Sequence, residues 1–187
     1  LFTSSGTNIK GKNMSFILKK YFDEKNIPNI IFQETFSTEL KKLVDYDQET
    51  DEYKDVSSGH LPFVSAFCSF WEEHTSYEVE APELEIDEVA TIFALIKPTS
   101  ANVSSDMILD LLRHHFPEVI IEDDKYIHNI FCKLWDKRLQ VEKMVQGLML
   151  SQEEKPLSLY DMYSSYTSIH SPKMSKRCFE KIASETL

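Results

Sequence analysis

Hydrophobic residues near the start of the chain follow the repeat of an amphipathic helix. The positions i, i+3, i+4, i+7 and i+8 are filled by Met14, Ile17, Leu18, Tyr21 and Phe22. Asn13 stands where an N-cap would be, and the helix is predicted to end before Pro28, which cannot continue it. The apolar residues 30–32 then predict one short strand.

Two more helices are predicted before residue 75. The first begins near Ser37, and its apolar side consists of Phe36, Leu40, Leu43 and Val44. The second has Pro62 in its first turn, and its apolar stripe consists of Phe63, Phe67, Phe70 and Trp71. The aromatic residues of this stripe are either core or an exposed ridge for a partner, and we predict core. Residues 45–59 lie between the helices and hold six acidic residues, so we expect a mobile insertion there.

Strand patterns follow the third helix. Residues 77–80 and 83–86 alternate polar and apolar positions on the two sides of Pro82, which predicts a wing-like β-hairpin. Residues 87–97 are compatible with a strand or with a helix.

The second half of the chain predicts a similar succession of elements. A helix capped by Ser104 or Ser105 carries Ile108, Leu111, Leu112, His115 and Phe116 and ends at Pro117. Residues 119–121 predict a strand. A helix capped by Asp123 or Asp124 follows, with Ile127, Ile130, Phe131 and Leu134 on its apolar side. Another helix carries Leu159, Met162, Tyr163 and Tyr166, and the last begins with Ser171 and Pro172 and carries Met174, Cys178, Phe179 and Ile182.

A short unit recurs along the chain. A proline followed by three apolar positions occurs at 28–32 and again at 117–121, 89 residues apart, each time between helical patterns. The alternative is a chance match of one proline and three aliphatic residues. The order helix, strand, helix, helix is that of a winged helix-turn-helix. We therefore predict a mostly α fold with short β-hairpins, of class α+β, in two tandem winged helix-turn-helix modules. These are residues 13–97 and 103–187, after a linker or tail at 1–12 and with a polar joint at 98–102.

Net charge is concentrated in one part of the chain. Of the total of −11, residues 45–88 contribute −13, from fourteen acidic residues and Lys54. Such a stretch repels phosphates and attracts basic proteins. Little or no direct DNA binding is therefore expected.

Two groups of charged residues are candidate partner-binding sites. The acidic group consists of Asp45, Asp47, Glu49, Asp51 and Glu52. The basic group consists of Lys173, Lys176, Arg177 and Lys181, which would share one face of the last helix. The alternative for both is an ordinary solvated surface.

Residue patterns for catalysis or metal binding are weak. The four glycines form no phosphate-binding loop, and no nucleophile elbow is present. His128 and Cys132 are four residues apart, after His114 and His115, but Cys132 has the apolar neighbours of a core cysteine. We predict no enzyme activity, no metal and no cofactor. The three widely spaced cysteines predict an intracellular, reducing compartment, and no apolar run predicts a membrane span.

The runs 13–44 and 104–139, with the short final helix, resemble a known family. The chain is similar to the C-terminal tandem winged-helix region of the yeast-type Stn subunits of the CST telomere-capping complex, which are related to the middle subunit of replication protein A. The strongly acidic first module departs from a winged helix that reads DNA.

The resemblance implies a non-enzymatic protein-interaction module at telomeres in the nucleus. Its expected partners are the regulatory subunit of DNA polymerase alpha-primase and other telomere-capping subunits, and its expected role is to protect chromosome ends and limit telomerase. The alternative function is that of a nucleic-acid-binding winged-helix transcriptional regulator.

Overall fold

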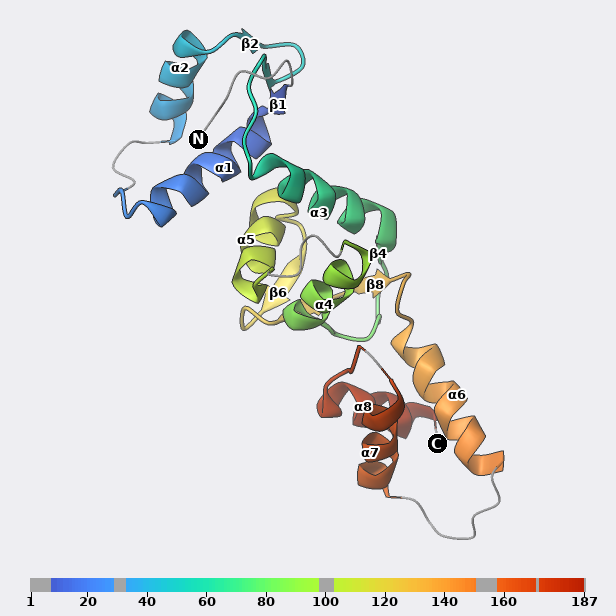
Figure 1. The fold of residues 1–187 in the computed structure, drawn as a ribbon. Coiled ribbons are helices and arrows are strands. Elements are labelled where there is room, and N and C mark those ends of the chain that lie inside the picture. Colours follow the sequence, from blue (N-terminus) through green and yellow to red (C-terminus); the bar gives the residue numbers. More distant parts are fainter. Residues whose placement is uncertain (1–7, 29–32, 98–102, 151–157, 171, 187) are drawn as a thin grey trace. The chain divides into compact units, whose positions relative to one another are not determined.

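The computed structural model describes residues 8–28, 33–97, 103–150, 158–170 and 172–186 (Figure 1). The chain divides into two compact units, which we call unit 1 (Leu1–Ser69) and unit 2 (Phe70–Leu187). Within the described residues, eight helices and short antiparallel strands give an α+β fold dominated by helices, which confirms the predicted class.

Unit 1 contains a small antiparallel sheet and three helical segments. Its elements are β1 (Ile9–Lys10), α1 (Gly11–Glu24), α2 (Gln33–Leu43), β2 (Tyr46–Asp47), β3 (Glu52–Tyr53) and the larger part of α3 (Leu61–His74). Strand β3 is central in the sheet, with Ile9 of β1 and Tyr46 of β2 both opposite Tyr53. The sequence pattern did not predict this sheet.

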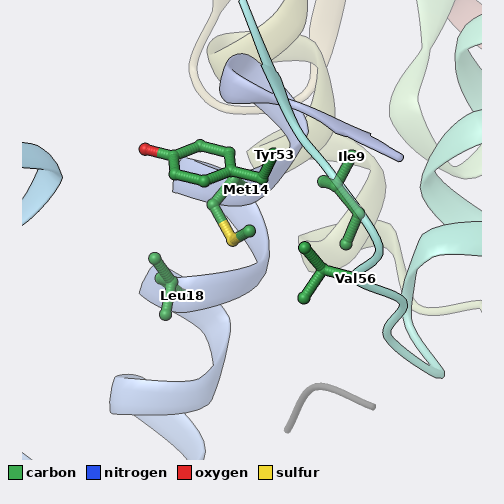
Figure 2. Close-up of a cluster of buried hydrophobic side chains, with 5 residues drawn as sticks. All are labelled: Ile9, Met14, Leu18, Tyr53 and Val56. Atoms are coloured by element: carbon green, nitrogen blue, oxygen red, sulfur yellow. The ribbon is translucent and has the colours of Figure 1, made fainter. Parts of the chain in front are cut away.

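The core of unit 1 joins the sheet to α1. Figure 2 shows its buried side chains, which are Ile9, Met14, Leu18, Tyr53 and Val56. Phe36, Leu40, Val44, Tyr46 and Leu61 pack against them and are partly buried. Burying these apolar side chains is the main contribution to the stability of the unit.

The segment 45–59 is not the mobile insertion that its acidity predicts. It contains β2 and β3, and it supplies Tyr53 and Val56 to the core, with 2% and 7% of their surface exposed. Two apolar side chains at the right positions outweigh the acidic composition, because the hairpin buries them against α1.

Helix α1 begins three residues earlier than the sequence predicts. Lys10 occupies the N-cap position, and the backbone N–H of Gly11 donates a 2.7 Å hydrogen bond to the carbonyl oxygen of Asp51. A contact from the hairpin thus satisfies a free donor at the helix start, so Asn13 lies inside the helix. The helix ends at Glu24, before Pro28, as predicted. The strand predicted at 30–32 lies outside the described residues.

Unit 2 contains five further helices and two small sheets. Its elements after α3 are β4 (Thr75–Tyr77), β5 (Leu84–Glu85), α4 (Ile86–Ile96), α5 (Ser105–His115), β6 (Ile120–Glu122), β7 (Tyr126–His128), β8 (Ile130–Cys132), α6 (Lys137–Leu150), α7 (Leu159–Ile169) and α8 (Lys176–Thr186). One sheet has the strand order β5-β7-β6, and in the other β4 pairs with β8. Helix α8 packs against both α6 and α7.

The predicted wing hairpin at 77–86 is wrong. Strand β4 pairs with β8, and the N–H of Glu78 continues this pairing with a 2.9 Å hydrogen bond to the carbonyl oxygen of Asn129. Strand β5 pairs with β7. The two segments thus find their hydrogen-bond partners about fifty residues later in the chain rather than in each other, a long-range choice that local alternation does not reveal.

The helix predicted after Asp123 or Asp124 is also wrong, because this region forms β7 and β8. Asp123 and Asp124 have φ values of 50° and 55°, in the left-handed region. Two successive residues of this kind make the tight turn that joins β6 to β7, where Ile121 lies opposite Ile127. Aspartate is common both in such turns and at helix N-caps, so the sequence signal was ambiguous.

The predicted division into modules 13–97 and 103–187 is wrong as well. Strands β4 and β5 of the predicted first module pair with β8 and β7 of the predicted second module. The chain instead divides into its two compact units between Ser69 and Phe70, within α3. The predicted joint at 98–102 lies outside the described residues.

Several predicted helices are confirmed. The stripe of α3 is core, since Phe67, Phe70 and Trp71 are all buried. Within unit 2 the ring of Phe70 contacts Phe93 of α4, and the ring of Trp71 contacts Phe116. Residues 87–97, whose sequence is compatible with a strand or a helix, belong mainly to α4.

The two C-terminal predictions differ in outcome. Helix α7 is present with Met162 and Tyr166 buried, as its stripe predicts. The last helix, α8, begins at Lys176 rather than at Pro172, and Ser171 lies outside the described residues. Among the described residues, no helix has the length and apolar character needed to span a bilayer.

Candidate protein interface

The predicted acidic site of unit 1 lies on and beside the β2–β3 hairpin. Its residues are Asp45, Asp47, Glu49, Asp51 and Glu52. Asp47 forms an ion pair with Lys54, at 2.9 Å, and accepts hydrogen bonds from the N–H groups of Glu49 and Thr50. These contacts, led by Lys54, lower the pKa of Asp47. Its carboxylate therefore shapes the turn more than it offers a charge to a partner.

Two further carboxylates of the hairpin have internal partners. The hydroxyl of Tyr46 donates a 2.7 Å hydrogen bond to Asp51, and the amide of Asn8 donates a 3.2 Å hydrogen bond to Glu52. Asp45 and Glu49 are exposed, and within the described residues neither side chain forms an ion pair. These two acids are the best placed of the five to meet a partner.

The predicted basic face of the last helix is only partly present. Lys173 precedes α8, so only Lys176, Arg177 and Lys181 lie on the helix. Lys176 lies 3.6 Å from Glu180, and Arg177 lies 3.7 Å from Glu83, measured between charged atoms. All four basic residues are exposed, but two of the charges are partly balanced by carboxylates.

A second acidic surface, which we call the α5–turn surface, lies in unit 2. It comprises α5 and the turn between β6 and β7, within residues 105–128. This stretch holds six acidic and two basic residues, a net charge of −4. The exposed acids are Asp106, Glu118, Glu122, Asp123 and Asp124.

Both cations of the α5–turn surface are held by carboxylates. Arg113 of α5 forms an ion pair with Asp124 of the turn, and Lys125 forms a 3.2 Å ion pair with Glu85. The hydrogen bond to Glu85 raises the pKa of Lys125, which therefore stays charged. The two positive charges are thus engaged within the protein, and the surface presents an excess of negative charge.

Unit 2 also contains a buried ion pair. Nζ of Lys137, at the start of α6, lies 2.6 Å from Oε2 of Glu88 in α4, and their side chains are 3% and 6% exposed. Lys137 also donates a 2.6 Å hydrogen bond to the carbonyl oxygen of Glu83, and Cys178 lies at 3.9 Å. Lys137 contacts three residues of unit 2, so we interpret the ion pair as part of the core.

The titratable residues weighed as a metal site are dispersed among structural contacts. His128 lies 3.0 Å from Glu122, and Cys132 is a buried free thiol. Burial raises the pKa of the Cys132 thiol, which suits a core residue better than a nucleophile. The described parts of the chain contain no group of three metal-ligating side chains.

Sequence reasoning missed the α5–turn surface and the buried pair. The acidic run of residues 122–124 is visible in the sequence, but Asp123 and Asp124 also suit a helix N-cap, which hides the turn. Lys137 gave no signal, because lysine is almost always a surface residue and its buried partner is 49 residues away.

No protein-family profile, curated protein or solved structure matches this chain.

Proposed function

We propose that this chain is a non-enzymatic protein-interaction module that binds a basic protein surface. The observation that supports it best is the acidity of the α5–turn surface, with both of its cations paired to carboxylates of the chain itself. The exposed acids Asp45 and Glu49 at the hairpin of unit 1 add to this negative charge.

The topology of unit 2 helps to decide which kind of partner this acidic surface binds. After the last residues of α3 and strand β4, the order β5, α4, α5, β6, turn, β7, with the strand order β5-β7-β6, agrees with that of a winged helix-turn-helix. In a DNA-binding helix-turn-helix the second helix of the motif, here α5, enters the major groove. We propose that unit 2 is a winged helix in which α5 and the turn bind protein.

Electrostatics separates this proposal from DNA binding. Proteins that bind DNA neutralise backbone phosphates with lysine and arginine, and this supplies much of their affinity. The α5–turn surface offers carboxylates instead. Opposite charge accelerates association with a basic protein, and like charge disfavours nucleic acid.

The resemblance to telomere-capping subunits supplies a first named partner. We propose that the chain binds the regulatory subunit of DNA polymerase alpha-primase, within a nuclear telomere-capping assembly. This identification rests on the resemblance alone, whereas the acidic surface supports any basic protein partner.

The test is a binding titration of the purified chain with that regulatory subunit. Asp106→Asn with Asp123→Asn removes two charges from the surface, and asparagine tolerates the left-handed backbone of residue 123. The matched control is Glu142→Gln with Glu185→Gln, which removes two exposed charges from α6 and α8.

We expect the surface variant to bind several-fold more weakly, mainly through slower association, and the control to bind like the parent. Absence of binding by the parent would remove the named partner. Equal weakening by both variants would remove the α5–turn surface as the site.

A further inference from the structure

A hollow in unit 2 lies beside the start of α4. It has a volume of about 460 Å³ and is lined by residues of α4, by Tyr163 of α7 and by the segment that precedes α8. Three of the lining residues are acidic, namely Glu85, Asp87 and Glu88, and the cation among them is Lys173. Glu85 is paired with Lys125 and Glu88 with Lys137, so among the described residues Asp87 is the lining carboxylate that forms no ion pair.

One oxygen of Glu88 lacks a hydrogen-bond partner. Oε2 accepts hydrogen bonds from Nζ of Lys137 and from the N–H of Glu85, at 2.6 and 2.7 Å. Oε1 is buried and accepts none within the described residues. A buried acceptor without a donor costs free energy. A ligand that donates a hydrogen bond to this oxygen would remove that cost, which favours binding at this position.

The other two carboxylates are held in place around the hollow. Glu85 pairs with Lys125 at 3.2 Å, and Asp87 accepts a hydrogen bond from the hydroxyl of Ser105. Glu88 is fixed by the reciprocal capping contacts between its own side chain and Glu85 at the start of α4. The acidic groups are thus positioned by the fold, and Oε1 of Glu88 is the carboxylate atom left without a donor.

We propose that this hollow receives one arginine or lysine side chain of the protein partner, which donates a hydrogen bond to Glu88. An arginine fits best, because its guanidinium group carries five donors and pairs with carboxylates in a fixed plane. The inference rests on the proposed function, since it specifies where a basic partner would place an anchoring side chain. Lys173 lines the same hollow and competes for its carboxylates.

The probe is Nα-acetyl-arginine N-methylamide, titrated into the full chain and followed by the backbone amide NMR signals of unit 2. The matched probe is the citrulline derivative, which has nearly the same shape without the charge. We expect saturable shifts at Glu88 and Thr91 with arginine, and at least tenfold weaker binding with citrulline. Equal effects of the two probes would overturn the proposal.

The blocking variant is Thr91→Trp, which fills the hollow from an exposed position of α4 without altering the buried pair. Its control is Ser184→Trp, at an exposed position of α8 whose hydroxyl also bonds to the preceding turn. We expect at least a tenfold loss of arginine binding in the first variant and none in the second. Asp87→Asn should also weaken binding if Thr91→Trp proves unstable, and unchanged binding in both variants would overturn the proposal.

The outcome is separable from that of the proposed function. Partner binding that is sensitive to Asp106 and Asp123, combined with no arginine signal at Glu88, rejects the hollow alone. Arginine binding at Glu88, combined with no binding of basic proteins, rejects the proposed function alone.

Discussion

Lys137 and Glu88 form a 2.6 Å ion pair inside unit 2, between the first residue of α6 and the first turn of α4. Both side chains are more than nine-tenths buried, so each charge depends on the other for compensation. The pair connects the strand-rich part of unit 2 to its C-terminal helices and positions the carboxyl group that lines the acidic hollow.

Removing one member of this pair should destabilise unit 2 strongly. Lys137→Met leaves the Glu88 carboxylate buried without its cation, and we expect a loss of about 3 to 5 kcal/mol in the free energy of unfolding. Adding Glu88→Leu should restore much of that loss, because two apolar groups replace the pair. Urea unfolding of the parent and the two variants measures both effects. Similar stabilities of the single variant and the parent would show that the pair is not essential to the fold.

Stability should also depend on pH through Glu88. Burial raises the pKa of Glu88 above its ordinary value of 4.5, although Lys137 acts in the opposite direction. The folded state then holds this proton more tightly than the unfolded chain does. The contribution is complete below pH 4.5 and is lost as the pH rises through the raised pKa.

We therefore expect Glu88→Gln to change the slope of stability against pH above that ordinary value. The free energy of unfolding should fall with rising pH in the parent relative to the variant, as measured by urea unfolding at several pH values. Parallel curves would mean that Glu88 has the same proton affinity in the folded and unfolded chains.

The aromatic core of unit 2 gives another stability prediction. Trp71 is 4% exposed and its ring contacts Phe116. Trp71→Ala should reduce the free energy of unfolding by about 3 to 5 kcal/mol, as large-to-small changes in buried aromatic residues do. Glu72→Ala, at the next and exposed position of α3, is the control and should have little effect. Lost partner binding with unchanged stability would instead indicate that Trp71 belongs to an interface.

The local sequence predicted those helices whose apolar residues keep a regular spacing between clear end signals. Helix α5 is the best example, because Ser104 caps it and accepts a hydrogen bond from the N–H of Met107. Helix α3 was equally clear from Pro62 and its aromatic stripe. In both cases one face of the helix is buried, so the spacing of apolar residues indicates which face packs against the core.

Strand pairing and burial of charge were not predictable in the same way. Ile130 of β8 pairs with Tyr77 of β4, and no local pattern specifies a partner so far along the chain. The segment 45–59 is held to the core by Tyr53 and Val56, two apolar residues in a stretch whose acidic composition is typical of a solvated loop. Lys137 begins α6 from inside the core, which inverts the usual preference of lysine for the surface.

The acids of the unit 1 hairpin should contribute to partner binding by long-range attraction. Asp45→Asn with Glu49→Gln removes two exposed charges that have no ion pair within the described residues. We expect slower association with a basic partner, with a larger effect at low salt, because exposed charges are screened beyond roughly 8 Å at physiological ionic strength. Asp47→Asn is the comparison, since its charge is already balanced by Lys54. Association rates that do not change with salt would exclude this role for the hairpin.

We propose that the acidic surface of unit 2 binds protein rather than DNA. The most direct test is an anisotropy titration of a fluorescein-labelled duplex DNA with the full chain at physiological salt. We predict no saturation at submicromolar protein, because non-specific binding even by DNA-binding proteins has dissociation constants of about 10⁻⁴ to 10⁻⁶ M, and this surface repels phosphates. Saturable binding at submicromolar concentration, abolished by reversing the charges of Lys173, Lys176, Arg177 and Lys181, would contradict the account and establish nucleic-acid binding through the basic residues instead.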